Sequence, residues 1–325
     1  DEECRVIPLD GGRNNRVYRI DGLAAPVLVK NYFANSQDRR DRYVTERAFY
    51  GCLKSNDARY VPQPLGWDSE HRLGVFTFVA GRKLEICEID QVAIDAAMAF
   101  FNETNSDRKS AVAAKLGDAS EACFSVKAHL DLVDRRVERI SQIEGTDELT
   151  ARASMFVREK LSPRWRAVRD DAVRKFDRIG IPFERELGAR ERCISPSDFG
   201  FHNAIRRPDG TFVFFDFEYA GWDDPAKLTC DFFCQRQKPV SLKFWDQVVS
   251  AVEGQLGVSS DYRTRALTLY PVYQVKWCCI ILNEFLSSEL ARRSFSSRAF
   301  DAEDTRGQQL AAAEQFLETI RPITT

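Results

Sequence analysis

The chain has 325 residues, enough for one large domain or for two lobes. It carries 47 lysines and arginines against 49 acidic residues, so its net charge of −2 argues against a nucleic-acid or anionic-membrane partner. The most apolar run, residues 277–286, is too short to span a membrane and is broken by Asn283 and Glu284.

The first 81 residues are predicted to consist mainly of strands. Two alternating runs flank the turn sequence Asp-Gly-Gly-Arg-Asn-Asn at residues 10–15, and a third run ends at Lys30. Residues 40–53 show the apolar spacing of a helix, and two further strands are joined by a polar turn at residues 68–72. We therefore expect a small β-rich N-lobe over residues 1–81.

The rest of the chain is predicted to be largely helical. Helical patterns run from about residue 85 to residue 188, a hairpin follows around the turn sequence 206–211, and helices continue to the end. The expected fold class is therefore α+β, with the small N-lobe joined to a larger helical C-lobe over residues 82–325.

The cysteines indicate the compartment. All nine are scattered, mostly in apolar stretches, and no paired histidines or second cysteine pair have the spacing of zinc ligands. Cys230 and Cys234, one helical turn apart, lack such partners as well. We expect reduced, buried thiols in a cytoplasmic protein.

One stretch carries polar residues at a spacing that suggests chemistry. Asp198 and Asn203 lie in the sequence Ser-Pro-Ser-Asp-Phe-Gly-Phe-His-Asn before the hairpin, and Asp216 follows the apolar strand behind it. Phosphoryl transfer on the protein kinase fold needs a carboxylate that accepts the proton of the attacking hydroxyl, and a carboxylate and an asparagine that hold magnesium. Although Asp198 and Asn203 alone could each belong to a turn, a carboxylate behind an apolar strand is costly to bury without a partner or metal. Together the three residues favour a kinase site.

Upstream residues supply the remaining parts that such chemistry requires. Gly11 and Gly12 allow backbone N–H groups to approach phosphates closely. Lys30 is placed to bind the α- and β-phosphates, and Glu46 on the following helix could hold it by an ion pair. The backbone of Thr77 to Val79 could contact adenine. Simpler interpretations stay open, because Lys30 could be a surface lysine and Glu46 could face water.

The same segments resemble the aminoglycoside phosphotransferase and choline kinase-like family of small-molecule kinases. The motif of that family is His-Gly-Asp-x-x-x-x-Asn, followed by a sequence such as Ile-Asp-Phe-Glu and a Gly-Asp-Pro element. This chain has Pro-Ser-Asp with Asn203, then Phe-Asp-Phe-Glu and Gly-Trp-Asp-Asp-Pro. The resemblance covers nearly the whole chain and implies a two-lobed protein kinase-like fold that uses Mg²⁺ with ATP, or GTP. It further implies Asp198 as the catalytic base, Asn203 and Asp216 as magnesium ligands, and Lys30 with Glu46 as the phosphate clamp.

The chain departs from the family pattern around the catalytic loop. Pro196 replaces the histidine that usually stands two residues before the aspartate and mainly supports the loop. Gly200 stands where the family has a second histidine, whereas His202 comes later, and we expect His202 to be packed and hydrogen-bonded rather than a base. Asp224, directly before Pro225, is expected to cap a helix.

The charge of the helical lobe suggests the class of acceptor. Residues 108–178, expected to form part of the acceptor wall, carry sixteen lysines and arginines against twelve acidic residues. A site for polycationic aminoglycosides would need carboxylates, so a neutral or anionic hydroxyl compound, such as a sugar or a sugar phosphate, is favoured. Arg236 and Lys238 could contact an anionic acceptor, although a solvated loop is the simpler interpretation.

Two other functional classes stay open. A non-catalytic, nucleotide-binding pseudokinase is suggested by Pro196. It is opposed by four intact residues: Lys30, Asp198, Asn203 and Asp216. A kinase with a macromolecular acceptor is the other. The segment after Asp216 runs almost directly into a helix and shows no obvious activation segment, which favours a small acceptor. The partners expected from the sequence are a nucleoside triphosphate and a small hydroxyl acceptor, with no nucleic acid and no membrane.

Overall fold

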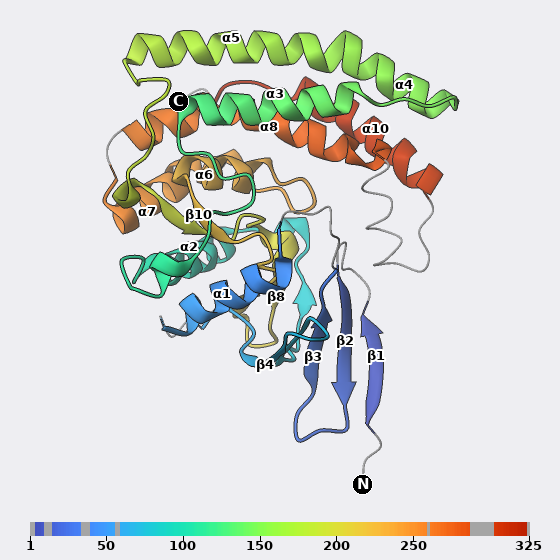
Figure 1. The fold of residues 1–325 in the computed structure, drawn as a ribbon, viewed down its shortest axis with the longest axis vertical. Coiled ribbons are helices and arrows are strands. Elements are labelled where there is room, and N and C mark those ends of the chain that lie inside the picture. Colours follow the sequence, from blue (N-terminus) through green and yellow to red (C-terminus); the bar gives the residue numbers. More distant parts are fainter. Residues whose placement is uncertain are drawn as a thin grey trace.

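The computed structural model describes residues 4–9, 15–33, 40–55, 59–258, 261–286 and 302–323 (Figure 1). The strands are β1 (Arg5–Leu9), β2 (Arg16–Asp21), β3 (Val27–Asn31), β4 (Pro64–Asp68), β5 (Leu73–Thr77), β6 (Arg82–Lys83), β7 (Cys193–Ser195), β8 (Ala204–Arg206), β9 (Phe212–Phe214) and β10 (Gly221–Asp223). The α-helices are α1 (Arg42–Ser55), α2 (Gln91–Asn105), α3 (Val126–Ser141), α4 (Glu148–Phe156), α5 (Ser162–Ile179), α6 (Pro225–Cys234), α7 (Trp245–Leu256), α8 (Asp261–Ile281) and α10 (Ala302–Glu318).

A five-stranded antiparallel sheet forms the N-terminal part, with the strand order β1-β2-β3-β5-β4. Because β3 is the central strand, Lys30 lies between Val17 of β2 and Gly74 of β5. This central position buries Lys30, which is only 7% exposed. The strands predicted for this region are confirmed.

Helix α1 packs against this sheet through aromatic side chains. The ring of Trp67 on β4 lies 5.7 Å from Tyr43 and 6.0 Å from Tyr50, measured between centroids. Tyr50 also lies 5.0 Å from Phe76 on β5. Residues three, four and seven apart share one face of a helix, so Glu46 points in the same direction as the two tyrosines and is buried.

Helix α8 is the centre of the helical part. It packs against α3, α5, α6 and α10, and α4 and α5 form the outer layer, farthest from the sheet (Figure 1). The sequence of α8 lacks the polar stripe of a surface helix, and most of its side chains are accordingly buried. In the described part of the chain, no helix is both long and apolar enough to cross a membrane.

Two small sheets complete the strands: β7 pairs with β10, and β6, β8 and β9 form a three-stranded sheet. The predicted hairpin β8–β9 is confirmed, and its turn contains Gly210 at a φ of 87°, where glycine is favoured. Because β6 directly precedes the helices and pairs with β8, it supports a boundary near residue 81. The boundary itself remains a prediction.

The cysteines are mostly buried, as expected. Seven of the nine are buried free thiols, whereas Cys4 and Cys87 are exposed. Burial raises the pKa of the Cys52 thiol to about 11 and that of the Cys123 thiol to about 12. These two thiols therefore stay protonated and unreactive near neutral pH.

Candidate active site

A cavity of about 1060 Å³ lies between the N-terminal sheet and the helical part. It brings together most of the predicted site residues, which come from both parts of the chain: Lys30, Glu46, Thr77, Val79, Asp198, Asn203 and Asp216. Gly11 and Gly12 lie outside the described residues.

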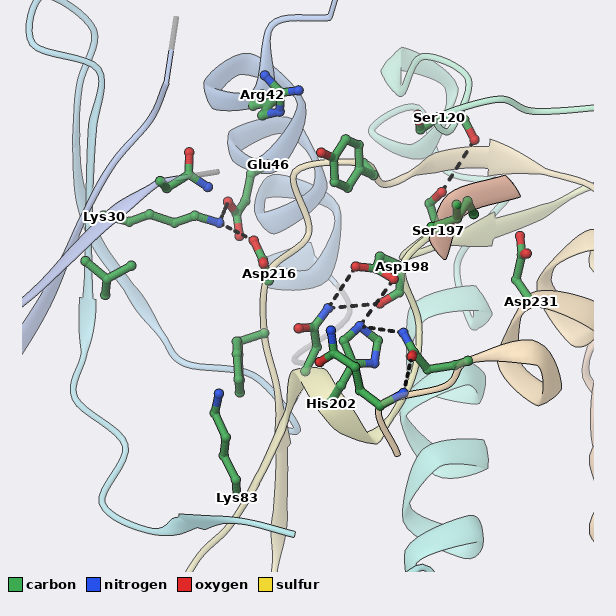
Figure 2. Close-up of a pocket in the computed structure, with 18 of the residues that line it drawn as sticks. Lys30, Arg42, Glu46, Lys83, Ser120, Ser197, Asp198, His202, Asp216 and Asp231 are labelled. Carbon is green, nitrogen blue, oxygen red and sulfur yellow. Dashed lines mark hydrogen bonds and ion pairs between the residues drawn. The ribbon is translucent and has the colours of Figure 1, made fainter. Parts of the chain in front are cut away.

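Lys30 is the centre of an ion-pair cluster on the sheet side of the cavity (Figure 2). Its Nζ atom lies 2.7 Å from Glu46 Oε2 and 2.5 Å from Asp216 Oδ1. Burial alone would lower the pKa of Lys30, but the charges of Asp216 and Glu46 outweigh it and raise the pKa, so the ammonium stays charged. The interpretations of a surface lysine and a solvent-facing glutamate are therefore wrong.

Glu46 also ties this cluster to the segment that follows β9. Its Oε1 atom accepts a hydrogen bond from the backbone N–H of Phe217 at 2.9 Å. Asp216, one residue earlier, has a φ of 69°, a conformation that non-glycine residues rarely adopt. Such a conformation persists only where surrounding contacts hold it. Here the Asp216 carboxylate is held by its ion pair with Lys30.

The loop that carries Asp198 is fixed by short-range hydrogen bonds. Ser197 has a φ of 67°, and its backbone N–H donates to Ser195 Oγ at 2.9 Å. Asn203 donates its side-chain amide to the Asp198 carbonyl oxygen at 3.1 Å and to Asp198 Oδ2 at 3.4 Å. The Asp198 side chain is still 39% exposed and lines the cavity, so it is oriented but accessible to a bound hydroxyl group.

His202 supports the same carboxylate from the protein interior (Figure 2). Its Nε2 atom lies 3.2 Å from Asp198 Oδ1, and its side chain is only 7% exposed. The side-chain nitrogen of Gln235 lies 3.2 Å from the same ring nitrogen. One ring nitrogen cannot serve both partners at once: Nε2 donates to Asp198 when it carries the proton and accepts from the Gln235 amide when it does not. The prediction of a packed, hydrogen-bonded histidine is confirmed, but no local pattern revealed its partner.

Glu218 is a buried acidic residue behind the ion-pair cluster, and its partners were missed by the sequence analysis. It accepts a hydrogen bond from the Asn15 side chain, and its Oε1 lies 3.5 Å from Arg42 Nε. Burial, together with the charge of Asp216, raises the pKa of Glu218 to about 7. Asn15 and Arg42 stand at a turn and at the start of α1, so only tertiary packing brings them here.

Asn203 and Asp216 fit the oxygen ligands of a divalent cation. Phe215 donates its backbone N–H to the Asn203 carbonyl oxygen at 3.1 Å, so the loop and the strand end lie side by side. The side-chain nitrogen of Asn203 donates to Asp198, so the Oδ1 atom of Asn203 can serve as a metal ligand. No group of three or more His, Cys, Asp or Glu side chains suited to a metal occurs among the described residues. A cation here would therefore need phosphate oxygens as further ligands, as is usual for Mg²⁺.

The opposite wall of the cavity comes from the helical part. Asp231 on α6 accepts hydrogen bonds from Lys276 at 2.8 Å through both oxygens, and from Trp277 Nε1 at 2.7 Å. Glu121, with a φ of 53°, accepts from Arg136 Nη2 at 2.6 Å. Burial opposes the ionisation of Glu121, but Arg136 and Lys276 outweigh it and lower its pKa to about 2. The segment expected to form the acceptor wall thus contributes to this cavity.

Asp224 caps helix α6, as predicted. Its Oδ1 accepts a hydrogen bond from the Ala226 N–H at 2.7 Å. The side chain is fully buried, its Oδ2 lies 2.9 Å from His129 Nε2, and the Arg265 guanidinium bonds both oxygens. This network fixes the start of the helix whose later residue Asp231 lines the cavity.

Of the two cations that the sequence suggested for an anionic acceptor, only Arg236 lines the cavity. The Nζ atom of Lys238 lies 3.5 Å from Glu85 Oε2, and Lys238 is not among the lining residues. A role for Lys238 at the acceptor is therefore not supported.

The fold has counterparts among solved structures. Choline kinase LicA from Streptococcus pneumoniae is 15% identical over 98% of this chain and 94% of that chain, with a TM-score of 0.55. Amicoumacin kinase hAmiN in complex with AMP-PNP and Ca²⁺ is 15% identical over 98% and 89%, with a TM-score of 0.55. A spectinomycin phosphotransferase in complex with ADP is 13% identical over 96% and 93%, with a TM-score of 0.54. At these identities the likeness shows the fold, which is the predicted protein kinase-like fold.

A comparison with curated proteins finds no match. A family model described as "Phosphotransferase enzyme family" matches residues 5–234. This range contains Lys30, Asp198, Asn203 and Asp216 and covers more than half of the chain. The protein therefore belongs to the phosphotransferase enzyme family, as the resemblance of its motifs to aminoglycoside phosphotransferases and choline kinases implied.

Proposed function

We propose that the protein is a small-molecule kinase that transfers the γ-phosphoryl group of ATP, with Mg²⁺, to a hydroxyl group of a small acceptor such as a sugar. One observation carries the proposal: a single cavity holds the buried Lys30–Glu46–Asp216 cluster on one side and the oriented, accessible Asp198 carboxylate on the other. These are the parts that phosphoryl transfer requires. ADP and AMP-PNP in the related structures support ATP as the donor.

The mechanism follows from the placement of these side chains. The Lys30 ammonium binds the phosphates and is held in place by Glu46. The backbone of Thr77 to Val79 contacts adenine where it lines the cavity. The Asp198 carboxylate orients the acceptor hydroxyl and takes its proton as the acceptor oxygen bonds to the γ-phosphorus, while the bond from that phosphorus to the β–γ bridging oxygen breaks and ADP leaves with the bonding electrons.

Asn203 and Asp216 would hold Mg²⁺, which supplies charge neutralisation at the phosphates.

Two alternative functions, a pseudokinase and a kinase with a macromolecular acceptor, would require different properties of the same site. A pseudokinase, which Pro196 favours, would bind nucleotide without transferring phosphate. A macromolecular acceptor would need a platform such as an activation segment, but β10 begins at Gly221 and α6 at Pro225, shortly after Asp216. The short connection supports a small acceptor.

The Asp198→Asn variant tests the proposal. We expect its turnover to fall by about 10²–10⁴-fold while nucleotide binding is retained, because the amide cannot accept the hydroxyl proton. The assay measures Mg²⁺-dependent ATP and GTP consumption with sugars, nucleosides, amino alcohols and aminoglycosides as acceptors.

Full activity of Asp198→Asn would show that the base is misassigned. Tight nucleotide binding by the wild-type protein without transfer to any acceptor would favour the pseudokinase instead.

A further inference from the structure

Two acidic side chains of the helical cavity wall, Glu121 and Asp231, are already matched by cations of the protein. Glu121 lies 2.6 Å from Arg136, and Asp231 lies 2.8 Å from Lys276. Each carboxylate is thus neutralised by its own partner. These two carboxylates consequently offer little free negative charge to a positively charged acceptor.

Arg236 differs from Arg136 and Lys276 of this wall. It follows α6 directly, lines the cavity and is partly buried. Among the described residues, no Asp or Glu forms an ion pair with it. Burial lowers the pKa of Arg236, and no carboxylate opposes that effect. A partly desolvated guanidinium without an anion is unfavourable by itself, and a ligand anion would compensate for it.

The guanidinium of Arg236 is held in a fixed position by helix α10. Its Nη1 donates to the Ala312 carbonyl oxygen at 2.8 Å, and its Cζ lies 5.6 Å from the centre of the Phe316 ring. A guanidinium has five N–H donors in a planar fork, so this contact leaves donors for a further partner. The side chain is therefore already ordered before a ligand binds, which reduces the entropy lost on binding.

The position of Arg236 in the chain connects it with the proposed catalytic base. Gln235, the preceding residue, lies 3.2 Å from the His202 ring nitrogen that contacts Asp198 at 3.2 Å. Asp198 and Arg236 line the same cavity, whereas the nucleotide-binding residues Lys30 and Glu46 come from the sheet side. An acceptor whose hydroxyl group reaches Asp198 therefore lies in a cavity whose helical side includes Arg236.

We propose that Arg236 binds an anionic group of the acceptor, so that the substrate is a hydroxyl compound that also carries a carboxylate or a phosphate, such as a sugar acid or a sugar phosphate. Both anions match the fork of the guanidinium, which bonds either in a bidentate way. The inference rests on the proposed kinase function and specifies its substrate class. It predicts that an acceptor with only an amino or a quaternary ammonium group is a poor substrate.

The test uses inorganic phosphate and acetate as probes of the anion site. Calorimetric titrations are made on the full chain with saturating MgADP, so that the nucleotide phosphates occupy their own site. The wild-type protein should bind one of the two probes. Arg236→Gln should weaken that binding by about 10- to 100-fold, as expected for loss of a charged hydrogen bond, with Arg236→Lys intermediate. Lys238→Gln, in the same loop but outside the cavity, is the matched control.

Preference for phosphate indicates a phosphorylated acceptor, and preference for acetate indicates a carboxylic acid. A turnover assay with glucose, glucuronate, glucose 6-phosphate and glucosamine should rank an anionic member first, and Arg236→Gln should remove that preference. Equal probe binding by the wild-type and Arg236→Gln proteins, with MgADP binding intact, would overturn this inference alone. Failure of the wild-type protein to bind MgADP would instead overturn the proposed function.

Discussion

The Asp198 carboxylate is held by two side chains, Asn203 on one oxygen and His202 on the other. In the resembling family a histidine two residues before the aspartate supports this loop, and Pro196 has replaced it here. His202 is buried and its Nε2 lies 3.2 Å from Asp198 Oδ1, so we expect it to act as the positioning residue in its place. Small displacements of a reacting group have large effects on rate, so the contribution of this single contact can be tested.

We expect His202→Phe to lower kcat by about 10- to 100-fold, because the carboxylate loses an oriented N–H donor. The KM for MgATP should stay nearly unchanged, because His202 contacts the base and not the sheet side of the cavity. His202→Gln keeps a side-chain N–H and should recover most of the activity. Steady-state kinetics and melting temperatures of both variants separate the two possible roles. Equal loss of activity in both, with equal loss of melting temperature, would mean that His202 is needed for packing only.

At the scale of elements, the sequence predicts strands and turns, which depend on neighbouring residues, but not contacts between residues that are distant in the chain. The hairpin β8–β9 and the strands of the N-terminal sheet follow from alternation and turn residues and are confirmed. Asp198, Asn203 and Asp216 flank that hairpin, so their proximity could be inferred. Glu218 gains Asn15 and Arg42 as partners only through the docking of the sheet and α1, and no short-range pattern encodes such contacts.

Asp224 caps helix α6 and is buried, whereas Asp90 caps helix α2 and is exposed, so the two show how burial changes the stability contributed by a capping aspartate. Asp224→Ala should lower the free energy of unfolding by about 3–5 kcal/mol, because it leaves the buried Arg265 guanidinium without its partner. Asp90→Ala removes an exposed cap that accepts from the Ala93 N–H at 3.1 Å, and should cost about 1 kcal/mol.

Urea denaturation of the wild-type protein and both variants measures the difference. If Asp224→Ala does not fold, Asp224→Asn keeps the cap but removes the charge and should give an intermediate loss. Similar losses in the variants of the two caps would contradict the importance of the buried network.

At the scale of the whole molecule, the segment after β9 joins the two parts of the chain. The Phe217 ring centre lies 4.8 Å from Phe49 and 5.5 Å from Tyr50 on α1, and 5.7 Å from Phe100 on α2. Asp216 directly precedes this ring, so the proposed metal ligand stands at the junction itself. Ligands bound at Asp216 should therefore stabilise the folded molecule as a whole.

This expectation can be measured through Asp216→Ala. In the wild-type protein, MgADP should raise the melting temperature more than ADP with EDTA does, because the metal links the phosphates to Asp216. In Asp216→Ala the contribution of Mg²⁺ should disappear. Asp209→Ala, which alters only an exposed hairpin turn, is the control and should behave like the wild-type protein. An unchanged Mg²⁺-dependent shift in Asp216→Ala would rule out its role as a metal ligand.

The two hydrogen-bond partners of Glu46, Lys30 and the Phe217 backbone, have a consequence for regulation. Helix α1 cannot swing away from the cavity without breaking both contacts and separating its aromatic rings from Phe217. The proposed phosphate-binding cluster is therefore assembled without a bound substrate. We expect progress curves without a lag, because helix α1 need not move before the first turnover.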